Sequence, residues 1–229
     1  MRKIYATGLR NGDVPVINSF SFQGPVLVLA PHPDDEIGCG GMIARLIEQG
    51  YEVHHYYFSD CEESNKALGH DTSQLIEECN ASRRVLGIPS ENWGCFDFRV
   101  RYFPEQRQEI LESLIKLRSK LRPGLVLAPN KSDIHQDHST IAMEAIRAFK
   151  HCSILGYELP WNMLESSHDC LVKLDKKHLD VKLASLACYK SQGSRHYANH
   201  KFFESLACIR GVQAQTEYAE CYEVIRMVY

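Results

Sequence analysis

Apolar and polar residues follow two different periods along this chain. Short continuous apolar runs are typical of strands buried on both faces, and they alternate with segments whose apolar residues recur at helical spacing. Strands are predicted at residues 26–30, 51–58, 93–98, 125–128, 153–159, 170–174 and 222–229. Helices are predicted at 38–49, 72–86, 104–121, 140–150, 176–189 and 202–209, with an irregular lead-in over 1–24 and a polar loop over 59–71. This alternation predicts an α/β fold with a mostly parallel central sheet.

The composition is that of an ordinary globular protein. A chain of 229 residues with 44% hydrophobic and 24% charged residues can bury a large core, and no boundary divides it, so we expect one domain over residues 1–229. The net charge of −3 argues against a nucleic-acid partner, and no long uncharged apolar run predicts a membrane span. Nine cysteines without a C-x-x-C pair, and residues 1–20 without the apolar core of a signal peptide, favour a reduced, cytoplasmic protein. The sequence is compatible with a homo-oligomer.

Two polar clusters follow two of the predicted strands. The first is His32-Pro33-Asp34-Asp35-Glu36 and the second is Ser132-Asp133-Ile134-His135-Gln136-Asp137-His138. Ligands of open α/β sheets bind just beyond the carboxyl ends of the strands, where both clusters would lie. A catalytic zinc takes three nitrogen or oxygen ligands from the protein and keeps one position open. The clusters therefore predict a hydrolase that depends on zinc or another divalent metal.

Two other interpretations of these clusters compete with a metal site. Solvated loop residues are one, although two such clusters directly after buried strands are hard to explain in that way. A nucleotide-binding loop is the other, because Gly38, Gly40 and Gly41 follow the first strand. That pattern fails because Ile43 stands where the third glycine of G-x-G-x-x-G is needed.

The two motifs together resemble those of the PIG-L/LmbE-type N-acetylglucosaminyl deacetylases. The resemblance covers most of the chain and includes the segments Val85-Leu86-Gly87-Ile88 and Lys190-Ser191-Gln192. It implies a Rossmann-like three-layer α/β sandwich. It also implies that the substrate is a small N-acetylglucosamine-type sugar or sugar conjugate, from which acetate is released.

Site roles follow from the same resemblance. It implies that His32, Asp35 and His138 are the zinc ligands and that Asp34 is the general base. It implies further that His135 is an electrophilic or acidic group positioned by Asp137. The chain departs from the family pattern at Ile76, where many members have arginine, and at Asp133, where some have tyrosine. We expect a structural role for Glu36, near a helix N-terminus.

The sugar pocket is harder to predict than the metal site. Carboxylates, amides and arginines that follow predicted strands or belong to family positions are candidates, and each could instead be a surface residue. They are Glu78, Asp97, Arg101, Glu158 and Asn162. Two competing functions stay open on the sequence, namely a zinc amidohydrolase acting on another amide and a noncatalytic sugar-binding relative.

Overall fold

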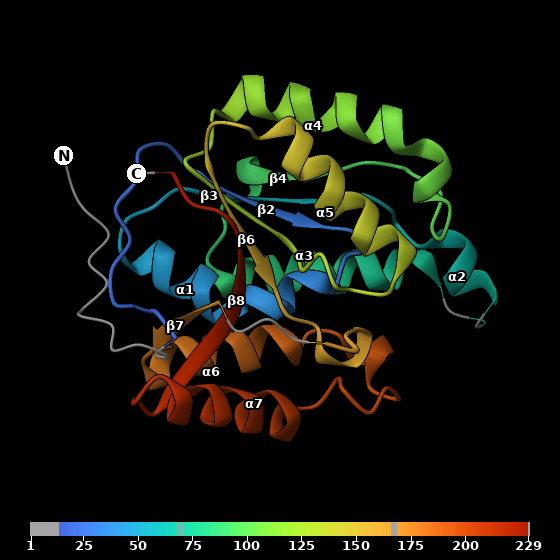
Figure 1. The fold of residues 1–229 in the computed structure, drawn as a ribbon. Helices are drawn as coiled ribbons and strands as arrows, with labels where there is room; N and C mark the ends of the chain where they lie inside the picture. The colour runs from blue at the N-terminus through green and yellow to red at the C-terminus, as the bar shows by residue number, and fades with distance from the viewer. Residues whose placement is uncertain (1–13, 68, 70, 166–168, 229) are drawn as a thin grey trace.

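A single mixed sheet forms the middle layer of the computed structural model, which describes residues 14–67, 69, 71–165 and 169–228 (Figure 1). The strands lie in the order β1-β7-β8-β6-β5-β2-β3-β4. Neighbours are parallel except β8, which is antiparallel to both β6 and β7. The strands are β1 (Val16–Ile17), β2 (Val26–Ala30), β3 (Val53–Tyr57), β4 (Trp93–Cys95), β5 (Leu125–Pro129), β6 (Ser153–Tyr157), β7 (Cys170–Leu174) and β8 (Tyr218–Arg226).

Helices cover both faces of this sheet. The α4 and α5 pair lies on one face, and α1, α3, α6 and α7 lie on the other (Figure 1). The helices are α1 (Gly40–Glu48), α2 (Glu62–Ala67), α3 (Thr72–Leu86), α4 (Arg107–Leu121), α5 (Gln136–Ala148), α6 (Lys176–Leu186) and α7 (His200–Gln213). The arrangement confirms the predicted α/β sandwich with its mostly parallel sheet.

Strand β2 has no polar residue because both of its faces are buried in the core. Val26 and Val28 pack in the cluster that contains α1, whereas Leu27 and Leu29 pack in the cluster that contains α4 and α5. Both faces of the strand are thus removed from water, as the continuous apolar run predicts. No described helix has the length and apolarity needed to cross a membrane. All nine cysteines lie in the described part and are free thiols.

The predicted helix boundaries are wrong in two places that matter for the site. The expected loop over 59–71 contains α2, whose first turn is held by the Asp60 carboxylate, an acceptor for the Glu62 N–H at 2.9 Å. Helix α5 begins at Gln136 and not at 140, because the His135 ring accepts the Asp137 N–H at 3.2 Å and caps the helix. The second polar cluster is therefore partly helical.

Topology brings the two polar clusters together. Strands β2 and β5 are parallel neighbours, with Val26 opposite Leu125 and Val28 opposite Leu127. Their carboxyl ends, Ala30 and Pro129, consequently lie at the same edge of the sheet. The chain that leaves each strand enters the same region of space.

Candidate metal-binding active site

The first cluster is a tight turn closed by one of its own carboxylates. After β2 the chain runs through Pro31–Asp34 into a short 3₁₀ helix, Asp35–Cys39. Asp35 Oδ2 accepts the backbone N–H of His32 at 2.8 Å and lies 3.2 Å from His32 Nδ1. The spacing of three residues therefore places a carboxylate oxygen beside an imidazole nitrogen. Both side chains are buried.

Glu36 stabilises the same turn through hydrogen bonds to two residues outside it. It is fully buried and accepts the Ser82 hydroxyl at 2.6 Å. The Tyr189 hydroxyl lies 2.5 Å from Glu36 Oε1 and 2.7 Å from the Pro33 carbonyl oxygen. Burial raises the pKa of Glu36 to about 7. Its hydrogen bonds to Ser82 of α3 and to Tyr189 support the structural role expected for it.

The second cluster orients His138 through an aspartate that precedes α5. Asp133 Oδ1 accepts the His135 N–H at 2.8 Å, and Asp133 Oδ2 lies 2.8 Å from His138 Nδ1. His138 is in the first turn of α5 and is buried. The early start of this helix is what directs its imidazole toward the first cluster.

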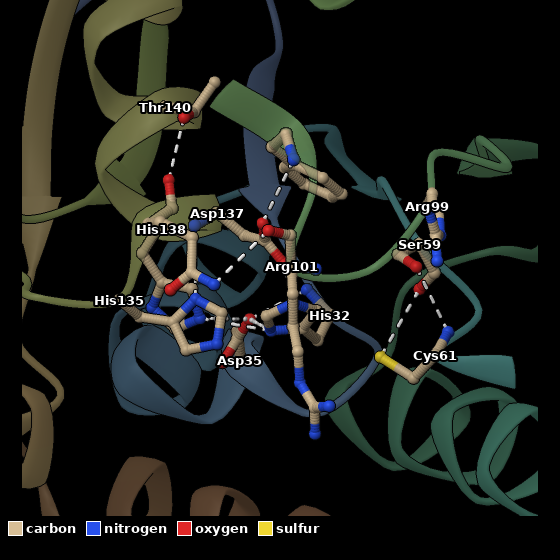
Figure 2. A network of polar contacts seen from close by, with 12 residues as sticks. His32, Asp35, Ser59, Cys61, Arg99, Arg101, His135, Asp137, His138 and Thr140 are labelled. Carbon is tan, nitrogen blue, oxygen red and sulfur yellow. Dashed lines mark hydrogen bonds and ion pairs between the residues drawn. The ribbon is translucent and has the colours of Figure 1, made fainter. Parts of the chain in front are cut away.

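Three potential ligand atoms converge where the clusters meet (Figure 2). His32 Nδ1 lies 3.1 Å from His138 Nε2, and Asp35 Oδ2 lies 3.2 and 3.3 Å from these two nitrogens. One ring nitrogen of His135 also lies within 4.8 Å of a ring nitrogen of each of the other two histidines. The structure thus brings together His32, Asp35 and His138, with His135 next to them.

The donor set fits a divalent cation. Carboxylates only accept hydrogen bonds, so Asp137, 3.0 Å from His32 Nε2, and Asp133, beside His138 Nδ1, place the protons of the neutral rings on those nitrogens. The inner nitrogens then present lone pairs to each other and to the Asp35 carboxylate, an arrangement that a cation between them stabilises. Asp35 and Asp133 outweigh burial and raise the pKa of His138 to about 10, so the site favours a positive charge, which a bound cation would supply in place of the second ring proton.

Asp137 contacts two histidines through different groups. Its carboxylate contacts His32 Nε2 and accepts the backbone N–H groups of Arg101 at 2.6 Å and Phe103 at 3.3 Å. Its link to His135 is through its backbone N–H only. The reason is the helical turn of α5, in which side chains two residues apart point in different directions. Asp137 therefore contacts both histidines, His32 through its carboxylate and His135 through its backbone N–H.

His135 is held as a neutral hydrogen-bond donor. Since Nδ1 accepts the Asp137 N–H, the ring proton is on Nε2. Burial, together with His138 and His32, lowers the pKa of His135 to about 4. A protonated Nε2 cannot bind a metal, whereas it can donate a hydrogen bond to an oxygen atom at the centre. The arrangement suits the electrophilic role that the sequence implies.

A cavity of about 310 Å³ opens onto this centre. Asp34, Asp35 and the three histidines form its floor, and Trp161 and Tyr197 stack in its wall with ring centroids 3.9 Å apart. Burial and the neighbouring Asp35 carboxylate raise the pKa of Asp34, as suits a proton acceptor. Arg101, Cys61 and Arg195 also line the cavity.

The five sugar-pocket candidates divide into two groups. Arg101 and Asn162 line the cavity, whereas Glu78, Asp97 and Glu158 lie outside the described lining. Glu78 instead accepts the Ser191 N–H at 2.9 Å, and Glu158 pairs with Arg210 at 2.7 Å. Asp97 is exposed beyond β4. Glu78 lies on α3, where its carboxylate accepts from Ser191, and Glu158 follows β6 but is needed by the buried Arg210 guanidinium.

Sequence reasoning missed several residues of the site. Asp133 could have been found, because it lies in the second cluster five residues before His138. Tyr189, Arg195 and Tyr197 have no motif and follow the less regular part of the chain, so no local signal identifies them. Their place in the cavity wall depends on the packing of α6 against α1 and α3.

The fold and the centre define an α/β protein with a candidate metal site at the carboxyl edge of its sheet. The chain belongs to the PIG-L family, since the model of that family, described as GlcNAc-PI de-N-acetylase, matches residues 27–149. This result confirms the resemblance inferred from the two motifs.

Individual relatives extend the match. The chain is 28% identical over 191 residues to the uncharacterized deacetylase YaiS of Escherichia coli K12, covering 78% of this chain and 97% of YaiS. It is 29% identical over 154 residues to the diacetylchitobiose deacetylase of Thermococcus kodakarensis, covering 64% of this chain and 52% of that enzyme. A solved structure with the same fold is GalB, the 4-carboxy-2-hydroxymuconate hydratase of Pseudomonas putida KT2440, with a TM-score of 0.74 and 23% identity over 90% of this chain and 98% of GalB. The family favours deacetylation, but the fold alone does not define the reaction.

Proposed function

We propose that this protein is a metal-dependent hydrolase that removes the acetyl group from an N-acetylglucosamine-type sugar or sugar conjugate. The deacetylase relatives support the reaction type. The observation that carries the proposal is the convergence of His32 Nδ1, His138 Nε2 and Asp35 Oδ2 within 3.3 Å of one another on the cavity floor. Zinc suits two imidazoles and a carboxylate, although other divalent ions accept the same ligands. We expect the reaction to take place in the cytoplasm.

The residues of the centre have distinct parts in this mechanism. His32, Asp35 and His138 would hold the ion, which when bound supplies Lewis-acid chemistry and makes water more acidic. Asp34 accepts a proton from the attacking water while the oxygen of that water adds to the acetyl carbon. The His135 Nε2–H donates to the carbonyl oxygen as negative charge develops there. The C–N bond then breaks, Asp34 returns its proton to the departing amine, and acetate is released.

Acetate release decides between this function and its alternatives. Protein stripped with a chelator and reloaded with zinc, manganese or cobalt is incubated with N-acetylglucosamine, N,N′-diacetylchitobiose and unrelated acetamides. Deacetylation that depends on the added metal and on Asp34 supports the proposal. Turnover of the unrelated acetamides alone indicates an amidohydrolase of another kind. Sugar binding without acetate release indicates a noncatalytic relative, and acetate release from fully stripped protein refutes the metal dependence.

A further inference from the structure

Arg101 lies in a backbone conformation that an L-residue rarely adopts. Its φ is +71°, in the left-handed region, and it is one of four described non-glycine residues with positive φ. Such a conformation persists only where the surroundings enforce it. Here the Arg101 N–H donates to Asp137 Oδ2 at 2.6 Å, and its carbonyl accepts from Gln136 Nε2 at 3.3 Å.

The same bond ties Arg101 to the metal centre. Asp137 Oδ2, which accepts the Arg101 N–H, also lies 3.0 Å from Nε2 of the candidate ligand His32. The Cα of Arg101 is therefore fixed relative to the imidazole through a single carboxylate oxygen. The side chain of Arg101 therefore begins at a fixed position relative to the candidate metal centre.

The guanidinium of Arg101 is left without a protein partner. Within the described part of the chain no hydrogen bond or ion pair is formed by its side chain, and no dashed line ends on it in Figure 2. Arg99, two residues earlier, pairs with Glu63 at 2.7 Å, and Arg107 hydrogen-bonds Glu144 at 2.7 Å. Arg101 instead lines the cavity. Its five donors are available to a molecule that enters there.

A second arginine lines the same cavity. Arg195 lines the cavity, with Nη1 2.5 Å from the Tyr197 hydroxyl, and the only carboxylates among the described lining residues are Asp34 and Asp35. Asp133 and Asp137 contact the ligand histidines, so four carboxylates would balance a divalent ion and both guanidinium groups. It is therefore the unpaired donors of Arg101, and not the net charge, that favour an anionic group.

We infer that the substrate carries an anionic oxygen group, a phosphate or a carboxylate, in addition to its N-acetyl group, and that Arg101 binds this group. The inference rests on the proposed deacetylase function and narrows its substrate class to acidic N-acetylated sugars. The planar guanidinium matches both anions through two parallel hydrogen bonds. Arg101 is then a specificity residue, which selects the substrate and positions it without taking part in proton transfer.

A comparison of neutral and acidic N-acetylated sugars as substrates of the metal-reloaded enzyme tests this inference. N-acetylglucosamine and N,N′-diacetylchitobiose are compared with N-acetylglucosamine 1- and 6-phosphates and with N-acetylmuramic acid, so that phosphate and carboxylate are distinguished. We expect kcat/KM to be higher for at least one acidic sugar. Arg101→Gln should raise KM for that sugar roughly 10- to 100-fold, as expected for loss of a charge-assisted hydrogen bond, with kcat little changed. Arg101→Lys should recover part of the loss.

Arg122 provides a matched control. It too is a left-handed arginine, with φ +49°, but it ends α4 and lies outside the cavity lining. Arg122→Gln removes the same charge from the same backbone conformation and should leave KM for acidic and neutral sugars unchanged. Equal kcat/KM for acidic and neutral sugars in the wild type would overturn the inference, as would an equal loss on both classes in Arg101→Gln.

A binding measurement separates this inference from the function on which it rests. Calorimetry on the zinc-loaded protein compares glucosamine with glucosamine 6-phosphate and muramic acid, none of which carries an acetyl group to be removed. Tighter binding of an acidic sugar, lost in Arg101→Gln and kept in Arg122→Gln, supports the anion subsite even if no acetate is released in any assay. Equal or absent binding of all three overturns the subsite, while metal-dependent acetate release from neutral sugars would leave the deacetylase function standing.

Discussion

The Asp137 carboxylate accepts its hydrogen bond from the His32 imidazole, 3.0 Å away, and not from the His135 side chain. This contact fixes which nitrogen of His32 carries the proton and so which one faces the other ligands. Carboxylates that orient a ligating histidine in this way commonly contribute 10- to 100-fold to metal affinity. Asp137 and Asp133 are two such groups, one for each histidine of the proposed ligand set.

Asp137→Asn is therefore expected to weaken zinc binding roughly 10- to 100-fold. The new amide can donate to Nε2 and so favour the tautomer whose Nδ1 carries the proton and cannot bind metal. Competition with a chromophoric chelator measures the zinc dissociation constant. Glu144→Gln is the control, because this acid lies on the same helix but pairs with Arg107 and Arg147. Unchanged zinc affinity in Asp137→Asn would contradict the orienting role.

Measuring the metal content of variants also distinguishes between two alternative sets of metal ligands. The proposed set is His32, Asp35 and His138, and the alternative replaces Asp35 with His135, whose nitrogen also approaches the other two. His138→Ala should lose most of the metal, since a three-ligand site is left with two ligands. His135→Asn should keep about one ion per chain. If elemental analysis finds His135→Asn empty and Asp35→Asn full, the alternative set is correct.

Substitutions of the two adjacent aspartates, Asp34 and Asp35, should have different effects on metal content and on kcat. Asp35 Oδ2 faces the imidazoles, and His138 and His32 lower the pKa of Asp35 despite burial, so it stays ionised. Asp34 lines the cavity instead. Asp34→Asn should keep its metal and its KM and lose roughly 10²- to 10⁴-fold in kcat, the range for a general base. Full activity in Asp34→Asn would show that the proton acceptor is another group.

The contrast between these residues shows what local sequence can predict. The two clusters could be placed together in advance because each follows a buried apolar run, and parallel neighbours end at one edge. The choice of His32, Asp35 and His138 within them came from the family resemblance. The start of α5 could not be placed in advance, since it depends on a histidine acting as a cap, a role for which Ser, Asp and Asn are the usual residues. Because the start of α5 was misplaced, the contact between the Asp137 carboxylate and His32 was not predicted.

The cavity wall was beyond prediction for a different reason. Arg195 and Tyr197 lie between α6 and α7 in a stretch without helical or strand period, and their approach to the centre is set by long-range packing. Glu158 shows the converse error. Its place after a strand suggested a ligand-binding residue, but the buried Arg210 guanidinium takes both of its carboxylate oxygens, at 2.9 and 2.7 Å.

A buried histidine outside the site should govern part of the acid sensitivity of folding. His55 on β3 is fully buried, and its Nδ1 accepts the Arg83 Nε–H at 2.8 Å. Burial, with the charge of Arg83, lowers the pKa of His55 well below its ordinary value. The folded protein therefore keeps this ring neutral, whereas the unfolded chain takes up a proton below about pH 6.5. Unfolding becomes easier as the pH falls through that value, because the unfolded state binds the extra proton.

The slope of stability against pH measures this effect. Between pH 6.5 and the depressed pKa, His55 should contribute up to about 1.4 kcal/mol of lost stability per pH unit. His55→Gln keeps an acceptor for Arg83 and removes the titration. It should be less stable than the wild type at pH 8 and should lose stability less steeply on acidification, so the two unfolding curves approach each other toward pH 5. Urea unfolding of both proteins at half-unit pH intervals gives the slopes, with exposed His151→Gln as the control for removing an imidazole. Parallel slopes for the wild type and His55→Gln would mean that His55 takes up its proton equally in both states.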